Sequence, residues 1–459
     1  MTRPQLTTLC GTFIASLAWQ DIPDKAIEVA KLGITDCLAV MLAGRSAKAV
    51  EILVNVLGQS TPSSRSNASL EVARLSWVRS ADAALINGTA AHVLDFDDIG
   101  ISVQPAHPSA VLVPTILSLI GPTTTGADLL LAYIAGYEIW AELACRESAQ
   151  HLEKGWHATA VFGTLASAAA ASKMLGLSAL QSATALSIAA SKSGGLVANF
   201  GSMTKPLHVG MAASAGVFAG QLAQQGFTAS ADVLESEKGF LTAFSPSGLV
   251  DWCTDTELGR VWRIIKYPLG IKKYPVCYAL HRVVDAAVQL GQRLPLPLFE
   301  LASIDVVIGA KQRQLLPYDE PHDLLQAKFS IPFSIAIALS VGELGLEQLS
   351  KSNLVDEGIR ELMDKVRVTT CDQVDPSNKT FSPYDKVTLQ WPDGEKASTC
   401  VRYALGHPSK PITSAAHATK FFQCMATTYT EHQTKRLYDM LISLEQLDLA
   451  SELLMLLKR

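Results

Sequence analysis

Four ionisable side chains stand next to expected helix starts. They are, in chain order, His107, His157, Lys205 and Lys272. Three of them are followed within three residues by a proline, which favours the first helical position. Free N–H groups at such helix starts attract anions, and the same positive end keeps an imidazole neutral, so that it can act as a base at pH 7. These four side chains therefore predict a site for an anionic substrate with acid–base groups around it.

An acidic segment, HVLDFDD at 92–98, is expected to end a helix that begins near Ser80. Leu85, His92 and Asp95 recur at helical spacing, which predicts that Asp95 faces inward with the apolar stripe. Carboxylates at the C-terminal end of a helix oppose its dipole. Taken locally, the segment fits a solvated acidic loop as well as a carboxylate that orients or charges a nearby histidine.

Each of these features is weak by itself. A histidine or lysine at a helix start is more often a surface residue. Tyr318, in LPYD at 316–319, is more often a packing or turn residue. The hypothesis of a site therefore requires that separate segments converge on one carboxylate-bearing substrate.

Composition and charge exclude several classes of protein. The 38 basic and 43 acidic residues give a net charge of −5, without the basic excess that nucleic-acid binding favours. No two of the eight cysteines lie closer than 24 residues, so no CxxC pair predicts a zinc or iron–sulfur site. The apolar runs are shorter than the roughly 20 residues that span a bilayer, and the N-terminus is poor signal-peptide material. We expect a cytoplasmic protein with reduced thiols and no metal, nucleic acid or membrane partner.

Hydrophobic periodicity predicts a mainly α fold, with a large helical domain and an inserted smaller α+β lid domain. Helices are expected at 22–42, 128–146, 157–175, 180–190 and 206–225, several of them rich in small residues that allow close helix packing. Strands are expected at 303–308, 366–370, 386–391 and 399–403, with helices at 277–291 and 331–342 between them. A helical segment returns at 415–458. The predicted domains are 1–265 plus 405–459, helical, and 266–404, α+β.

Five motifs in one order resemble the MmgE/PrpD family. They are HVLDFDD at 92–98, HPS at 107–109, KGWH at 154–157, TKPLHVG at 204–210 and IKKYP at 271–275. The resemblance covers nearly the whole chain. The family includes 2-methylcitrate dehydratase, cis-aconitate decarboxylase and iminodisuccinate epimerase.

The resemblance implies an active site between a helical domain and an α+β lid, commonly a homodimer, and catalysis without metal or organic cofactor. The catalytic positions that match are Asp95, His107, His157 and Tyr318. The substrate-binding positions that match are Lys205, Lys272 and, more weakly, His281. The chain departs from the decarboxylase pattern in a 95–107 stretch about two residues longer, nearer the dehydratase length, and in Ile99, where a threonine is frequent.

The chemistry implied by the resemblance is proton transfer at a carbon next to a carboxylate. Cations fixed in advance stabilise the extra negative charge, and we expect Lys205 and Lys272 to supply them. His107 is the first choice for proton transfer, with Asp95 orienting it. The predicted function is a cofactor-independent lyase that decarboxylates or dehydrates a small di- or tricarboxylate. The alternatives are a dicarboxylate epimerase on the same site and a non-catalytic carboxylate-binding homologue.

Overall fold

The structure, a computed structural model, describes residues 3–58, 79–293, 298–376, 378 and 380–457. The chain separates into two compact units, one formed by Met1–Leu269 with Ser414–Arg459 and the other by Gly270–Thr413. We call them the helical unit and the α+β unit. The fold is mainly α with a smaller α+β part between two helical segments, which confirms the predicted fold class. That the inserted part is a lid domain bounded at 266 and 404 stays a prediction.

The helical unit contains the predicted helices, displaced by a few residues at their ends. Its N-terminal helices are α1 (Leu6–Ser16), α2 (Asp24–Gly44), α3 (Lys48–Gly58), α4 (Ser80–His92), α5 (Pro108–Ser118), α6 (Gly126–Ala144) and α7 (His151–Lys154). They continue as α8 (Ala158–Met174), α9 (Ala179–Ala190), α10 (Thr204–Gln224), α11 (Phe240–Phe244) and α12 (Arg263–Lys266). The C-terminal return forms α19 (Ser414–Met425), α20 (Glu431–Ile442) and α21 (Ser451–Leu457), and Lys458 of the predicted segment lies outside the described residues.

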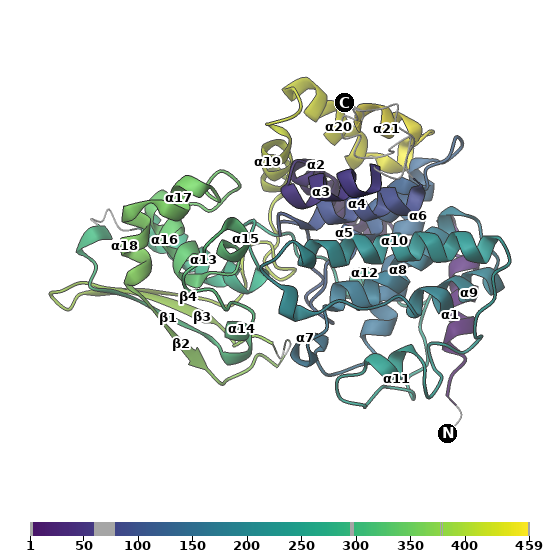
Figure 1. The fold of residues 1–459 in the computed structure, drawn as a ribbon, viewed down its shortest axis with the longest axis horizontal. Coiled ribbons are helices and arrows are strands. Elements are labelled where there is room, and N and C mark those ends of the chain that lie inside the picture. The colour runs from purple at the N-terminus through teal and green to yellow at the C-terminus, as the bar shows by residue number, and fades with distance from the viewer. Residues whose placement is uncertain (1–2, 59–78, 294–297, 377, 379, 458–459) are drawn as a thin grey trace. The chain divides into compact units, whose positions relative to one another are not determined.

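Small residues bring the central helices together. Helix α10 packs against α4 and α8, and Figure 1 shows it among α4, α5 and α8. A Cβ atom on Gly210 of α10 would overlap the Leu85 carbonyl of α4, and one on Gly216 would overlap Ser167 of α8. The glycine positions therefore allow the close approach that their sequence predicts.

The α+β unit is built on one four-stranded sheet in the order β2-β1-β3-β4. Its strands are β1 (Ser303–Gly309), β2 (Val366–Cys371), β3 (Asp385–Gln390) and β4 (Lys396–Val401). β1 pairs in parallel with β2 and antiparallel with β3, and β3 and β4 form the predicted hairpin, with Gln390 opposite Lys396. Gly394 supplies the positive φ of 92° at the turn.

Helices cover one face of this sheet. They include α13 (His281–Arg293), α16 (Ile331–Val341) and α18 (Glu357–Asp364), which lie on the same side in Figure 1. The shorter helices of the unit are α14 (Ala310–Gln314), α15 (Leu324–Ala327) and α17 (Lys351–Val355). Burial alternates along β3, as expected of a strand with one covered face.

One predicted helix start is wrong. Lys272 and the proline at position 275 do not open a helix, because α13 begins only at His281, after a 3-10 turn at Tyr278–Leu280. The N–H groups of Ile271 and Cys277 instead donate to carbonyls of distant segments, 2.9 Å in each case. These tertiary hydrogen bonds hold the stretch in a bent, non-helical conformation. In the part of the chain that the structure describes, we find no helix of sufficient length and apolarity to cross a membrane.

Candidate active site

The loop after α4 carries three aspartates in a strained backbone. Asp95 has a φ of +52° and is the non-glycine residue with positive φ in the described chain. Left-handed backbone costs an L-residue about 1–2 kcal/mol, and aspartate tolerates it better than most. Since α4 ends at His92, the helical period does not extend to Asp95. Because the chain leaves the helical path here, the side chains of the three aspartates contact different partners.

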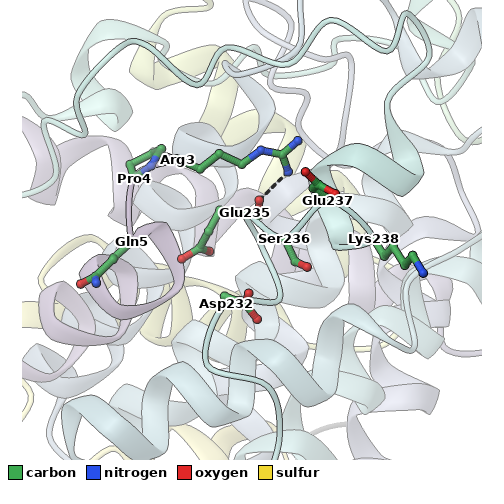
Figure 2. Close-up of a pocket in the computed structure, with 8 residues that line it drawn as sticks. All are labelled: Arg3, Pro4, Gln5, Asp232, Glu235, Ser236, Glu237 and Lys238. Carbon is green, nitrogen blue, oxygen red and sulfur yellow. Dashed lines mark hydrogen bonds between the residues drawn. The ribbon is translucent and has the colours of Figure 1, made fainter. Parts of the chain in front are cut away.

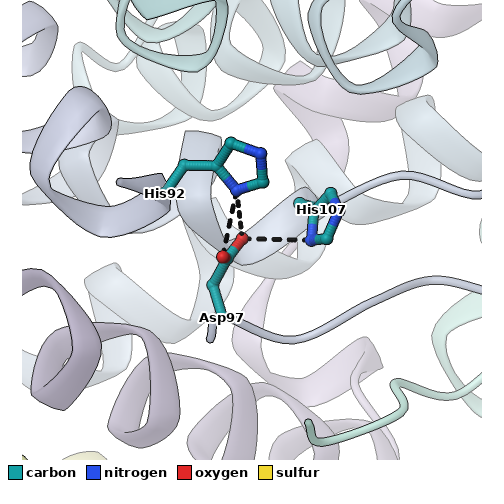
Figure 3. Close-up of side chains that lie close together, drawn as sticks. All are labelled: His92, Asp97 and His107. Atoms are coloured by element: carbon teal, nitrogen blue, oxygen red, sulfur yellow. Dashed lines mark hydrogen bonds and ion pairs between the residues drawn. The ribbon is translucent and has the colours of Figure 1, made fainter. Parts of the chain in front are cut away.

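Asp97 lies between two imidazoles, as Figure 3 shows. Its carboxylate oxygens are 3.0 and 2.9 Å from Nδ1 of His92. One of them is also 3.1 Å from Nδ1 of His107. The two rings lie 4.5 Å apart between centroids. All three side chains are buried.

The position of the proton on His107 follows from its partners. His107 is the N-cap residue of α5, and its Nδ1 lies 2.7 Å from the backbone carbonyl of Asp98. A carbonyl and a carboxylate only accept hydrogen bonds, so Nδ1 carries the hydrogen. In the neutral ring Nε2 then holds the lone pair and is the atom able to take up or deliver a proton.

Asp95 forms a buried ion pair with Lys205, the second residue of α10. Asp97 supplies a carboxylate that contacts the ring of His107. Asp95 is buried, as its spacing in the HVLDFDD segment predicts, and its role in orienting His107 stays a prediction.

A second pair of histidines lies beside the first. His157 is the N-cap residue of α8, as predicted, and its Nδ1 is 3.2 Å from Nδ1 of His208 on α10. Its ring lies 5.9 Å from that of His92. The ring of Phe200 packs edge-on against His157 at 5.0 Å and lies 5.1 Å from Nζ of Lys205. The structure thus brings together four of the seven predicted residues, namely Asp95, His107, His157 and Lys205.

Burial controls the charge of these groups. It lowers the pKa of His92 to about 3, with Lys205 adding to the effect and Asp97 opposing it. Burial by itself would raise the pKa of Asp97, but the imidazoles of His92 and His107 hold that pKa well below its usual range. Burial also lowers the pKa of His157, and the neighbouring His92, Lys205 and His208 add to this effect. At neutral pH the cluster contains neutral His92 and His157 beside an ionised Asp97.

His92, Asp97 and His107 are also the group, among residues that the structure describes, whose ligand atoms could hold a metal ion, all within 4.8 Å of one another. Two imidazoles and one carboxylate suit zinc or iron. The same atoms already satisfy one another through Nδ1–H donors, and a metal ion would have to replace those hydrogens.

The 93–98 loop is braced from the C-terminal segment. Lys420 of α19 donates to the Phe96 carbonyl at 2.7 Å, and its Nζ lies 4.1 Å from the Phe96 ring. It also forms a 2.7 Å ion pair with Asp36 of α2, and both side chains are buried. Sequence reasoning missed Lys420, since 324 residues separate it from Phe96 and no local pattern marks it. His92 and Asp97 were also missed, although both lie in the motif that was singled out.

The other predicted residues lie in the α+β unit. Lys272 is fully buried, and Tyr318 is half-buried in the segment after α14. His281 is the buried first residue of α13 and packs 5.2 Å from Tyr274 and 4.9 Å from Tyr278. Their roles in substrate binding and proton transfer stay predictions.

A separate surface pocket lies in the helical unit between residues 3–5 and residues 232–238 (Figure 2). Arg3 donates to the Glu235 carbonyl at 2.6 Å across it. None of the predicted site residues lines this pocket, so the pocket is not a candidate for the predicted active site.

The sequence of this chain is similar to those of known proteins. Residues 9–252 match the family model of the MmgE/PrpD N-terminal domain, and residues 274–446 match that of the C-terminal domain. A cis-aconitate decarboxylase of Mus musculus is 30% identical over 390 residues, which cover 82% of this chain and 78% of the relative. That of Homo sapiens is 29% identical over 475 residues, covering 100% and 95%. That of Aspergillus terreus is 27% identical over 467 residues, covering 96% and 94%.

Proposed function

The chain belongs to the MmgE/PrpD family, and we propose that it is a lyase that acts on a small di- or tricarboxylate, with the decarboxylation of cis-aconitate as its reaction. The relatives named cis-aconitate decarboxylase support this reaction. The observation that carries the proposal is the buried cluster in which His107, with its proton fixed on Nδ1, lies in the same unit as the Asp95–Lys205 ion pair. We propose that the reaction needs no metal or organic cofactor, as the family resemblance implies.

Binding uses the positive groups of the cluster. Lys205 lies in the first turn of α10, where free N–H groups add positive potential. A substrate carboxylate shares its ammonium with Asp95. Each such donor, fixed before the reaction, stabilises developing negative charge by roughly 3–4 kcal/mol. Lys272 and His281 are proposed as further carboxylate ligands.

The chemical step separates carbon dioxide from the substrate. The bond between one carboxyl carbon and its neighbour breaks, and the electron pair stays on the remaining carbon skeleton, where a conjugated carboxylate delocalises it. Nε2 of His107, in the protonated ring, delivers a proton to carbon and leaves an unsaturated dicarboxylate. One proton from solvent then restores the ring, so each turnover consumes one proton and releases one carbon dioxide. His157 and Tyr318 are proposed as a second donor or as carboxylate ligands.

The same residues could dehydrate a hydroxy acid or epimerise a dicarboxylate, so the test must separate reactions. The purified protein is incubated in deuterated water with cis-aconitate, 2-methylcitrate or iminodisuccinate, and each mixture is followed by NMR. Carbon dioxide release with one deuterium incorporated at carbon supports the decarboxylase. Turnover of only one of the other acids replaces it with the dehydratase or the epimerase. Thermal stabilisation by these acids without exchange or turnover indicates a carboxylate-binding homologue and contradicts the proposal.

Variants then test the residues. His107→Ala and Lys205→Ala are each expected to abolish turnover while the far-UV circular dichroism spectrum stays that of the native protein. Lys192→Ala, which removes an exposed lysine of the helical unit, is the matched control and is expected to keep full turnover. Undiminished turnover in either site variant removes that residue from the mechanism.

We also propose a homodimer, as the family resemblance implies. Helix α10 exposes Met211 and Phe218, 55% and 39% accessible and two helical turns apart on one side. Light scattering on the eluting protein is expected to give twice the chain mass, and Met211→Glu is expected to lower it. A monomeric wild-type protein contradicts the dimer. Cytoplasmic location stays a prediction, which cell fractionation tests.

A further inference from the structure

Two buried side chains in the cluster, His92 and Asp97, have no part in the mechanism described so far. We propose that they form a positioning pair for His107, in which His92 holds the Asp97 carboxylate and Asp97 fixes the ring of His107 and balances its charge. The inference rests on the proposed function for its kinetic consequence, but the geometry can be tested without any substrate.

The first argument is the direction of the hydrogen bonds. Asp97 is ionised and only accepts, so each Nδ1 that faces it is a donor. His92 contacts both oxygens of the carboxylate, at 3.0 and 2.9 Å, and so fixes its orientation as well as its position. The shared oxygen, 3.1 Å from Nδ1 of His107, is thereby held on the side of the ring away from Nε2.

The second argument is the count of charges. Burial keeps His92 neutral, with a pKa of about 3, so it clamps Asp97 without neutralising it. The negative charge of Asp97 remains for the imidazolium that His107 forms when Nε2 holds a proton. The other titratable groups that bear on this cluster include Lys205, which is paired with Asp95, and His157, which is neutral. They also include His208, whose pKa burial lowers, and the buried Asp98, whose pKa burial raises well above its usual range.

The third argument is that packing alone does not explain a histidine at position 92. Its Nε2 is buried, and no hydrogen-bond partner for that atom is found among the described residues. A buried unpaired polar atom costs about 1–3 kcal/mol, which a leucine of similar size would avoid. The Nδ1–H donor toward Asp97 is the feature that only a polar side chain provides.

The resting protein supplies the first test. Two-bond ¹H–¹⁵N spectra of protein labelled with ¹⁵N-histidine report which ring nitrogen carries hydrogen, and the signals are assigned with His92→Asn and His107→Gln. Wild-type His107 is expected as the Nδ1–H tautomer. Asp97→Asn is expected to shift the ¹⁵N signals of this ring and to add a minor Nε2–H form, since the Asp98 carbonyl still accepts from Nδ1. An Nε2–H tautomer in the wild-type protein, or no change in Asp97→Asn, overturns the proposal whatever the enzyme's substrate.

Kinetics supply the second test. Asp97→Asn is expected to lower kcat by roughly 10²–10⁴-fold, as loss of a properly oriented acid–base group does, with less than a threefold change in KM. His92→Asn places an amide N–H close to the position of Nδ1 and is expected to retain at least tenfold more kcat than His92→Leu. A rise in KM without loss of kcat, or equal rates in the two His92 variants, contradicts a positioning role.

A matched control separates positioning from stability. Glu142 is another buried carboxylate of the helical unit, held by Arg146 and Arg263. Glu142→Gln is expected to lower the unfolding midpoint at least as much as Asp97→Asn while kcat per folded molecule stays within threefold. If both variants lose kcat in proportion to stability, Asp97 is merely structural and the proposal fails. Loss of activity in EDTA, restored by zinc, also overturns it, because the three groups then hold a metal ion.

Discussion

Lys420 offers the sharpest test of how the fold supports the site. It connects α19 to the 93–98 loop through the Phe96 carbonyl and to α2 through Asp36, each at 2.7 Å. Lys420→Met keeps the length of the side chain and removes the ammonium. Asp36, which is 1% exposed, then loses this partner and keeps the longer 3.6 Å contact with Nε2 of His417.

The size of the effect follows from burial. Removing one partner of a buried ion pair destabilises a protein by about 3–5 kcal/mol. The hydrogen bond to Phe96 is charge-assisted and worth roughly 1.5–3 kcal/mol, but it shares the same ammonium, so the two values do not add. We expect Lys420→Met to lose about 3–5 kcal/mol of unfolding free energy. Adding Asp36→Asn removes the buried charge and is expected to recover about 2 kcal/mol.

Activity separates the two contacts of Lys420. Because both variants lack the donor to Phe96, the loop between Asp95 and Asp97 is held less firmly in each. Misplacement of catalytic groups by about 1 Å can cost 10²-fold, so kcat is expected to fall about 10- to 100-fold in the single and the double variant alike.

The assay is urea unfolding followed by circular dichroism at 222 nm, with turnover measured on the folded protein. Lys435→Met, which breaks an exposed ion pair with Asp439 on α20, is the control and is expected to match the wild type in both measurements. Wild-type stability in Lys420→Met, or a double variant no more stable than the single one, refutes the assigned ion pair. Recovery of kcat in the double variant refutes the bracing of the loop.

Three further predictions concern packing, pH and metal ions. Gly210→Ala is expected to lower the melting temperature or prevent folding, because the new methyl group overlaps the Leu85 carbonyl. Gly194→Ala, with open space around the new methyl group, is the control and is expected to melt as the wild type does. Equal melting temperatures of the two variants contradict the packing of α10 on α4. Burial lowers the pKa of His151 to about 4, so between about pH 6.5 and pH 4 the unfolded chain binds more protons at this residue and its contribution to stability falls as pH falls. The free energy of unfolding of His151→Gln is therefore expected to rise by up to about 3 kcal/mol relative to that of the wild type on going from pH 7 to pH 4. If the difference between the urea midpoints of the two proteins stays constant across this range, the burial of His151 is contradicted. Dialysis against EDTA is expected to leave turnover unchanged, and a loss that added metal reverses would contradict catalysis without a metal ion.

Much of the fold could be predicted because its signals are local. Helical periodicity placed the long helices, proline placed the start of α5 at Pro108, and alternating β-branched residues placed the strands. The same reasoning failed at the proline of position 275, where hydrogen bonds to distant segments prevail over the local preference. At Asp95 the predicted burial is observed, but no local signal shows that the next turn is left-handed or that Lys205 is an ion-pair partner.

The sequence by itself determined which residue types are available and that His107, His157 and Lys205 stand at helix starts, and its ordered motifs determined the family. Only the tertiary structure decided the partners: Asp97 for His107, Asp95 for Lys205, and Lys420 for the backbone between the two aspartates. The physical reason is the range of the forces. Helix formation depends on neighbours within four residues, whereas a hydrogen bond near 2.9 Å depends on how separate helices pack, which no spacing along the chain specifies.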